Sequence, residues 1–170
     1  MEMHIRGFEE SDLLPLFELL SDEEVMRYIE PPYTLEQTEA FLKKAGLSDP
    51  PLIYAAEDEE GNFAGYVIWH DYEEGCKEIG WILKRAYWGK GCAQALTKQL
   101  IARTASEGKS AVIECDPEQQ VTRHIAEKFG FIYVGCCDGC DVYRLEDTGA
   151  DKHGNRKGRY TDPERRGGGL

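Results

Sequence analysis

Apolar side chains along the chain follow helical spacing in some segments and strand spacing in others. Leu13, Leu16 and Leu20 recur every three or four residues behind Ser11 and Asp12, which predicts a helix with a polar N-cap. The same spacing predicts four more helices, with inward faces at Val25, Met26 and Ile29; at Ala40, Phe41 and Ala45; at Cys92, Ala93, Leu96 and Leu100; and at Val121, Ile125 and Phe129.

Short β-rich runs separate these helices. Residues 52–56 and 63–69 flank the turn-forming residues 59–62 and predict a hairpin. Further strands are expected at 3–6, 78–83, 111–113, 131–135 and 141–145, the last two as a terminal hairpin. Strands and helices that alternate in this way predict an α/β fold.

The last 24 residues differ in composition from the rest of the chain. Residues 147–170 contain six glycines and only three apolar side chains, Ala150, Tyr160 and Leu170. Such a segment cannot bury enough apolar surface to offset the entropy lost on ordering. We therefore expect one domain over residues 1–146, followed by a glycine-rich, basic and disordered tail over 147–170.

Length and charge narrow the classes of partner. The chain has 170 residues and a formal net charge of −12; the tail carries six basic and four acidic side chains, so residues 1–146 carry −14. A body this acidic argues against nucleic acid, whose binding relies on neutralised phosphates. It favours cationic partners, although a plain soluble surface is the simpler explanation of the charge. No apolar run approaches the length of a membrane span and the first residues lack a signal layout, so a cytoplasmic protein is expected.

The six cysteines are expected to be reduced in that compartment. Cys137 and Cys140 have the one spacing typical of a metal or redox site, but no second cysteine or histidine pair completes four ligands. We expect no metal, and a metal or redox role for these two cysteines is the weaker alternative to simple packing.

The segment between residues 78 and 96 carries the clearest chemical signal. A strand runs into Gly89 and Gly91, and a helix begins directly afterwards. Glycines let the backbone turn tightly, and the new helix adds unpaired N–H groups and the positive end of its dipole. Together these groups would accept a phosphate or pyrophosphate, whereas the alternative is an ordinary tight turn. The spacing matches neither the P-loop nor the Rossmann fingerprint.

This segment resembles the acetyl-CoA pyrophosphate loop of the GNAT superfamily of N-acetyltransferases, Gln/Arg-x-x-Gly-x-Gly/Ala, with residues 88–93 in its six positions. Trp88 replaces the leading Gln/Arg, but Tyr-Trp-Gly-Lys-Gly is typical of the branch that acetylates ribosomal-protein N-termini. Residues 25–29 with 34–42 resemble the N-terminal helices of that branch, and residues 118–131 resemble its late helix. The resemblance spans residues 3–146.

The resemblance implies a mixed, mostly antiparallel sheet flanked by helices, the acyl-CoA N-acyltransferase fold, and acetyl-CoA as cosubstrate. The residues that it assigns to acetyl-CoA are Ile82, Leu83, Lys84, Trp88, Gly89, Lys90, Gly91, Cys92, Ala93, Gln119 and Thr122. Gln119 and Thr122 replace the family's Asn and Ser but keep the capacity to hydrogen-bond the pantetheine arm. Ala126 stands where many members have a tyrosine general acid, so that role is unassigned.

The implied reaction is acetyl transfer to a primary amine by direct attack, with backbone amides near Leu83 stabilising the oxyanion. Glu78 is the candidate base: it shares a strand face with Gly80, which would leave open space beside the carboxylate, although a solvated charge is the alternative. Cys92 is expected to pack and not to act as a nucleophile. The acceptor would be a protein or peptide N-terminus or a small cationic amine, and a homodimer is left open. The alternative function is a non-catalytic acyl-CoA-binding module.

Overall fold

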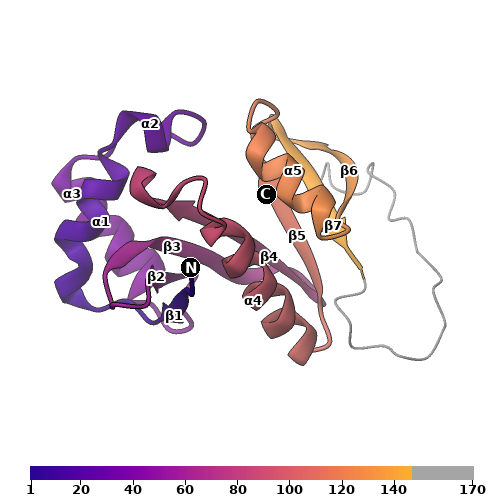
Figure 1. Cartoon of the computed structure of the whole chain (residues 1–170), viewed down its shortest axis with the longest axis horizontal. Coiled ribbons are helices and arrows are strands. Elements are labelled where there is room, and N and C mark those ends of the chain that lie inside the picture. The colour runs from indigo at the N-terminus through magenta and orange to yellow at the C-terminus, as the bar shows by residue number, and fades with distance from the viewer. Residues whose placement is uncertain (147–170) are drawn as a thin grey trace. The chain divides into compact units, whose positions relative to one another are not determined.

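The structure, a computed structural model, describes residues 1–146 (Figure 1). Its strands are β1 (His4–Arg6), β2 (Ile53–Glu57), β3 (Phe63–Glu73), β4 (Cys76–Leu83), β5 (Ser110–Cys115), β6 (Ile132–Cys137) and β7 (Cys140–Leu145). Its helices are α1 (Leu13–Leu20), α2 (Glu23–Met26), α3 (Leu35–Phe41), α4 (Cys92–Ser106) and α5 (Gln120–Lys128), with the short turns η1 (Glu10–Asp12), η2 (Leu42–Gly46) and η3 (Arg85–Tyr87). Every strand and helix expected from the sequence is present, and the tail expected to be disordered lies outside the described residues.

The seven strands form one sheet in the order β1-β2-β3-β4-β5-β7-β6. Strands β1–β2, β2–β3, β5–β7 and β6–β7 pair antiparallel, whereas β4 pairs with β5 in parallel over residues 76–78. The expectation of a mixed, mostly antiparallel sheet with helices packed on it is confirmed (Figure 1). No helix within residues 1–146 is long and apolar enough to cross a membrane.

The described chain divides into two compact units. The first contains residues 1–70 and 79–100, and the second contains residues 71–78 and 101–146. Strands β3 and β4 and helix α4 each contribute residues to both units. Most of the residues expected to bind acetyl-CoA therefore belong to the first unit.

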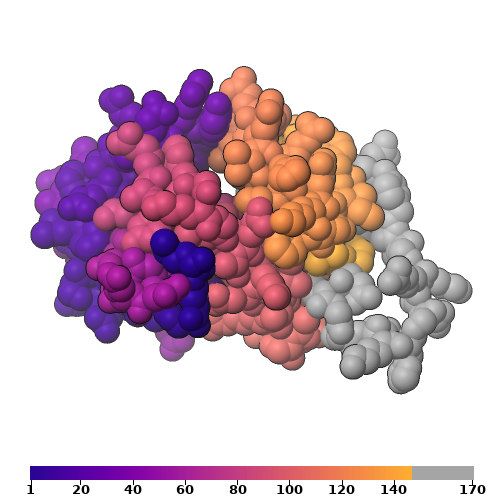
Figure 2. Space-filling view, in the orientation of Figure 1, coloured from indigo at the N-terminus to yellow at the C-terminus, as the bar shows by residue number. Residues whose placement is uncertain are grey.

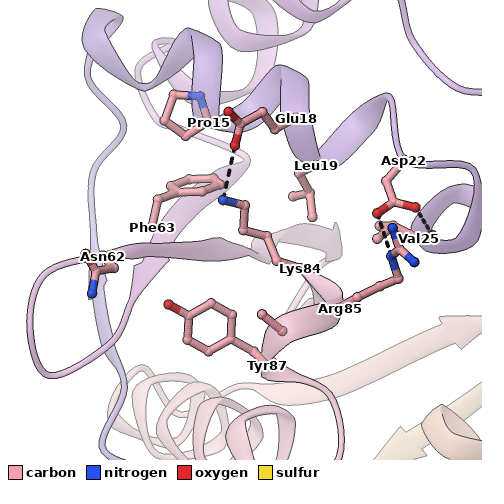
Figure 3. A pocket seen from close by; sticks show the side chains of 11 residues that line it. Pro15, Glu18, Leu19, Asp22, Val25, Asn62, Phe63, Lys84, Arg85 and Tyr87 are labelled. Atoms are coloured by element: carbon pink, nitrogen blue, oxygen red, sulfur yellow. Dashed lines mark hydrogen bonds and ion pairs between the residues drawn. The ribbon is translucent and has the colours of Figure 1, made fainter.

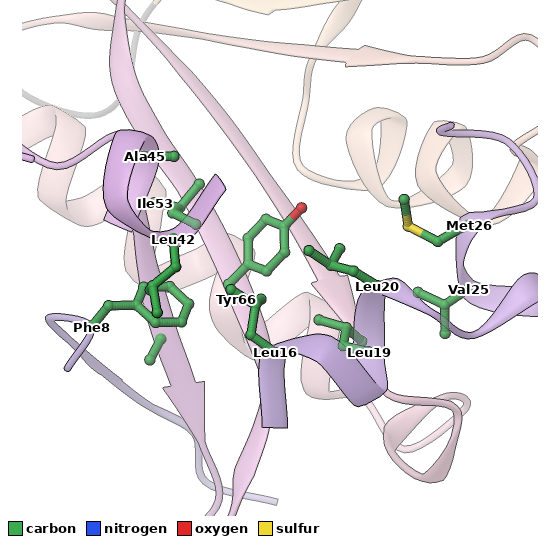
Figure 4. Packing of buried hydrophobic residues seen from close by; sticks show 11 residues of the cluster. Phe8, Leu16, Leu19, Leu20, Val25, Met26, Leu42, Ala45, Ile53 and Tyr66 are labelled. Atoms are coloured by element: carbon green, nitrogen blue, oxygen red, sulfur yellow. The ribbon is translucent and has the colours of Figure 1, made fainter. Parts of the chain in front are cut away.

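The core of the first unit lies between the N-terminal helices and one face of β2 and β3 (Figure 4). Leu16 and Leu20 of α1 are fully buried there, and the ring of Tyr66 lies between them and the side chains of Leu42 and Ile53. Burying side chains of this size removes most of their apolar area from water, which stabilises the unit by about 1.5–3 kcal/mol per side chain.

The expected inward faces of three helices are wrong in detail. Ile29, expected on the buried face of the second helix, is 39% exposed and lies beyond the end of α2 at Met26. Ala40 of α3 is exposed, and Thr38 is buried instead. The Thr38 hydroxyl donates to the backbone carbonyl four residues earlier (2.9 Å), so this polar side chain is buried with its hydrogen bond satisfied. In α5, Ile125 and Ala126 are buried as the spacing suggests, but Val121 is 73% exposed. Val121 lies in the first turn of α5, where nothing in the described chain covers it.

The chain's first residues lie against the turn between β2 and β3 (Figure 2). The amide of Glu2 donates to the carboxylate of Glu59 (2.8 Å). Further along β1, Arg6 donates to Glu57 (2.8 Å) and, through both terminal nitrogens, to Asp12 (2.8 and 2.9 Å). Asp12 was expected to cap α1; it instead accepts the Glu9 amide and holds the guanidinium of Arg6, which ties η1 to the edge of the sheet.

The second unit has a smaller core, in which Cys76, Val112 and Val142 come from three neighbouring strands. Its terminal hairpin is the one expected from the sequence. Strands β6 and β7 are joined by Asp138 and Gly139, both of which have positive φ angles (50° and 80°), as a two-residue hairpin turn requires.

Candidate functional site

The loop between β4 and α4 has the geometry of an anion-binding loop. Gly89 and Gly91 have φ angles of 70° and 78°, in the left-handed region that glycine alone adopts at low cost. A Cβ placed on either residue would meet no atom within 4 Å, so the loop surface beside them is open. Helix α4 begins directly afterwards at Cys92, and the N–H groups of its first turn have no partner within the helix.

The end of β4 leads into this loop through a close contact with β3. A Cβ on Gly65 would lie 2.1 Å from the carbonyl oxygen of Ile82, so only glycine permits the two backbones to approach there. The Lys84 amide then donates to the Ala64 carbonyl (2.8 Å). The end of β4 is therefore held close beside β3 before the chain enters η3.

Side-chain contacts anchor the segment between β4 and Gly89. The Tyr87 hydroxyl donates to Asp58 (2.8 Å), Arg85 Nε donates to Asp22 (2.8 Å), and the Trp88 indole N–H donates to the Leu83 carbonyl (2.9 Å). Asp22 and Asp58 were not identified from the sequence. Asp58 precedes a recognisable turn, but no local pattern connects it with a tyrosine 29 residues away.

A groove of about 630 Å³ adjoins this segment within the first unit (Figure 3). Lys84 and Arg85 reach from the end of β4 toward α1 and α2, where Lys84 pairs with Glu18 (3.3 Å) and Arg85 with Asp22. The aromatic rings of Phe63 and Tyr87 line the groove beside these ion pairs. Its charges are therefore paired with one another in the structure.

The loop residues expected to bind acetyl-CoA are brought together by the first unit. Ile82 and Leu83 end β4 and Lys84 follows them. Trp88, Gly89, Lys90 and Gly91 are exposed, with Trp88 at 49% exposure. Ala93 is half-buried in the first turn of α4. Cys92 is almost fully buried, with Sγ 3.9 Å from Met1 Sδ, which agrees with the expectation that it packs.

Gln119 and Thr122 lie at the start of α5, in the second unit. Both side chains are half-buried. The side-chain oxygen of Gln119 accepts the Asp116 amide (3.0 Å) and stabilises the turn before the helix, which leaves its side-chain N–H₂ as the group able to donate to a ligand.

Glu78 lies on β4 in the second unit, opposite Val112 of β5, and is half-buried. The open space expected beside it at Gly80 is absent, because a Cβ on Gly80 would lie 3.2 Å from Cδ1 of Ile68. The neighbouring strand fills that position, since Ile68 of β3 packs against the face that Gly80 leaves bare. Glu78 remains a candidate base, but Gly80 does not provide the open space for a substrate or water molecule that was expected beside it.

Neither the Cys137–Cys140 pair nor the position of the family's general acid has, within residues 1–146, the side chains that a metal site or a general acid requires. Cys137 and Cys140 face each other across the β6–β7 turn, and residues 1–146 contain no group of three His, Cys, Asp or Glu side chains placed to hold a metal. Ala126, at the position of the family's tyrosine acid, is fully buried. Tyr133, on the next strand, is exposed and packs its ring against Tyr143.

Comparisons with known proteins indicate the family of the chain. The sequence profile described as an acetyltransferase (GNAT) domain matches residues 2–132. A Bacillus subtilis protein named as the uncharacterised N-acetyltransferase YnaD is 27% identical over 140 residues, which cover 80% of this chain and 82% of that protein.

Solved structures share the fold over most of the chain. The crystal structure of a GNAT-family acetyltransferase from Bacillus anthracis is 26% identical, with a TM-score of 0.77, and covers 86% of this chain and 96% of its own. RimL, a ribosomal-protein α-N-acetyltransferase solved with coenzyme A, is 19% identical, with a TM-score of 0.76, and covers 89% of this chain and 97% of its own.

Proposed function

This chain belongs to the GNAT family of acetyltransferases, and from that premise we propose that it transfers the acetyl group of acetyl-CoA directly to a primary amine. The observation that carries the proposal is the open loop with two left-handed glycines at the start of α4. Left-handed glycines allow backbone N–H groups to point outward, and the helix dipole adds positive potential, which suits the two negative charges of a pyrophosphate.

The residues present fit acetyl-CoA. Side chains at Gly89 and Gly91 would strain the loop and cover its surface, and both positions are bare. Residues 88–93 would hold the pyrophosphate, with Lys90 adding a positive charge, and residues 82–84 would present backbone groups to the pantetheine arm. Gln119 and Thr122 carry the remaining hydrogen-bonding groups that this role needs.

The chemistry requires a neutral amine beside the thioester. The amine nitrogen bonds to the acetyl carbon, the carbon–sulfur bond breaks, and coenzyme A leaves as its thiolate, while one amine proton must pass to a base. Glu78 is our candidate for that base, directly or through a water molecule, and amides near Leu83 are candidates for stabilising the oxyanion. The general acid is unassigned, because Ala126 has no acidic proton.

The acceptor that we favour is a peptide N-terminus or a small cationic amine. The body of the chain carries a formal charge of −14, which attracts cationic substrates and speeds their encounter. RimL, whose structure shares this fold, acts on a ribosomal protein, and this supports testing a peptide α-amine first.

A second candidate function is acyl-CoA binding without turnover, which the buried Ala126 favours. Release of free coenzyme A from acetyl-CoA, measured across a panel of peptide N-termini, lysine peptides, polyamines and amino acids, distinguishes the two functions. Amine-dependent release above the rate without enzyme supports the transferase. Calorimetric binding of acetyl-CoA with no release for any amine supports the binding module, and no binding at all contradicts both.

A further inference from the structure

The segment that precedes the glycine loop is fixed at its ends and in its middle. Residues 85–88 connect the last residues of β4 to Gly89, and three of these four residues make side-chain hydrogen bonds to backbone or carboxylate oxygens elsewhere in the first unit. Trp88 bonds back to the strand that the chain has just left, so this bond closes the η3 turn on itself. The bonds of Arg85 and Tyr87 reach elements far away in the sequence.

Asp58 is a rigid partner for Tyr87. Its Oδ1 accepts the backbone amides of Glu60 (3.0 Å) and Asn62 (2.9 Å), so the carboxylate is part of the turn between β2 and β3. Its Oδ2 accepts the Tyr87 hydroxyl (2.8 Å) and a side-chain N–H of Asn62 (3.1 Å). The Asn62 amide and the Tyr87 hydroxyl together lower the pKa of Asp58 to about 2, so the acceptor is a carboxylate at any physiological pH.

Asp22 fixes Arg85 in the same manner. Its Oδ1 accepts the amides of Glu24 (3.0 Å) and Val25 (3.5 Å) at the start of α2, and its Oδ2 accepts Arg85 Nε. Figure 3 shows this side chain between the guanidinium and the helix start. Each carboxylate therefore shapes its own turn through Oδ1, and its Oδ2 accepts the bond from the segment before the loop.

A glycine loop needs such anchors if it is to bind an anion well. Glycine has the greatest backbone freedom of any residue, so Gly89 and Gly91 by themselves would leave the intervening amides poorly oriented. Contacts that fix the chain immediately before Gly89 lower the entropy that a ligand must otherwise remove on binding. Tyr87 is two residues before Gly89 and bonds to the rigid β2–β3 turn.

We propose that the Tyr87–Asp58 hydrogen bond, supported by Arg85–Asp22, positions the loop for the pyrophosphate of acetyl-CoA. This inference rests on the proposed function. Tyr87 and Asp58 are positioning residues in this scheme, because they act through the loop amides. The two residues should affect only the binding of the nucleotide half of the cosubstrate, so the kinetics with a donor that lacks the pyrophosphate should not change when they are replaced.

Two donors test this separation. We expect Tyr87→Phe to raise the KM for acetyl-CoA and the Kd for coenzyme A about three- to tenfold, because the bond that orients the loop is lost. The kcat at saturating acetyl-CoA and the kcat/KM for S-acetylpantetheine, which lacks the pyrophosphate and nucleotide, should stay within about twofold of wild type. An unchanged affinity for coenzyme A, or an equal loss with both donors, would overturn the proposal.

Tyr72→Phe is the matched control. It removes another hydrogen bond between a tyrosine and a carboxylate, to Glu114 (2.7 Å), at the far end of β3 from Gly65. Its KM for acetyl-CoA should be unchanged. The variant Asp58→Ala completes a cycle with Tyr87→Phe: the combined loss should be clearly smaller than the product of the two separate losses if both act through one bond. Independent losses would contradict the pairing.

Hydrogen exchange of the free protein tests the anchor without any ligand. The amides of residues 87–91 should exchange faster in Tyr87→Phe than in wild type and in Tyr72→Phe. Equal exchange in the three proteins would overturn the anchoring role. The amides of residues 87–91 could exchange more slowly in wild type than in Tyr87→Phe while wild type binds no coenzyme A. That result would contradict the proposed function and the positioning role, but it would leave the structural anchoring of the loop by Tyr87 intact.

Discussion

At the scale of single residues, the proposed pyrophosphate loop depends on the left-handed backbone of Gly91. Its φ of 78° is costly for any other residue, but the space around it is open. We expect Gly91→Val to weaken coenzyme A binding at least tenfold, because the branched side chain covers the loop and turns its amides away. Isothermal calorimetry measures this loss directly.

Gly108→Val is the matched control for Gly91→Val. Gly108 has a similar φ of 68° and an equally open surrounding, but it follows the other end of α4. Both variants should lose a similar amount of stability, about 1–2 kcal/mol from backbone strain. Only Gly91→Val should lose affinity, and an unchanged Kd in that variant would remove the loop from the binding site.

Glu78 is tested by removing its charge at constant shape. Near neutral pH a primary amine arrives mostly protonated, with a pKa of about 10.4 for an alkyl amine and about 8 for an α-amine, so attack requires a proton acceptor. We expect Glu78→Gln to lower kcat roughly ten- to a thousandfold, most strongly at low pH, with the Kd for acetyl-CoA unchanged. Steady-state rates across the pH range measure this, with the exposed Glu10→Gln as control. Wild-type turnover at every pH would leave an ordered water or the neutral amine alone as the explanation.

At the scale of elements, the contact between β1 and η1 makes stability depend on pH. Burial opposes the charge of Asp12, but the hydrogen bonds from Arg6 and the Glu9 amide outweigh it and lower the pKa of this carboxyl. The stabilisation is therefore fully present above the unfolded pKa of about 3.9 and is lost as the pH falls through the lower folded pKa.

The variant Asp12→Asn tests this contact. It should cost about 1–3 kcal/mol at pH 7, since it weakens a charge-assisted pair with Arg6 that is largely shielded from water. The difference from wild type should stay constant down to about pH 4 and shrink below it. Urea denaturation at several pH values gives both quantities, and the exposed Asp138→Asn should show neither effect. A difference that grows as the pH falls would contradict the assignment.

At the scale of the whole chain, residues 147–170 are expected to be dispensable for the acetyltransferase domain. Their few apolar side chains can contribute little buried area, and the GNAT profile ends at residue 132. We expect truncation after Glu146 to leave the melting temperature and the affinity for coenzyme A nearly unchanged. Differential scanning calorimetry and titration of both forms measure this, and a large loss of either would show that the tail contributes to the folded domain.

The sequence by itself determined the elements and the loop of this protein. Strand and helix periods are local properties, and glycine permits a left-handed φ wherever it stands, so the elements and the glycine turn before α4 were predictable without a fold. It did not determine which side chains meet. Ile68 fills the space beside Gly80, Thr38 replaces Ala40 in the core, and Asp58 holds Tyr87. Such contacts join segments whose separation in sequence has no fixed relation to their distance in space, so only the tertiary structure decided them.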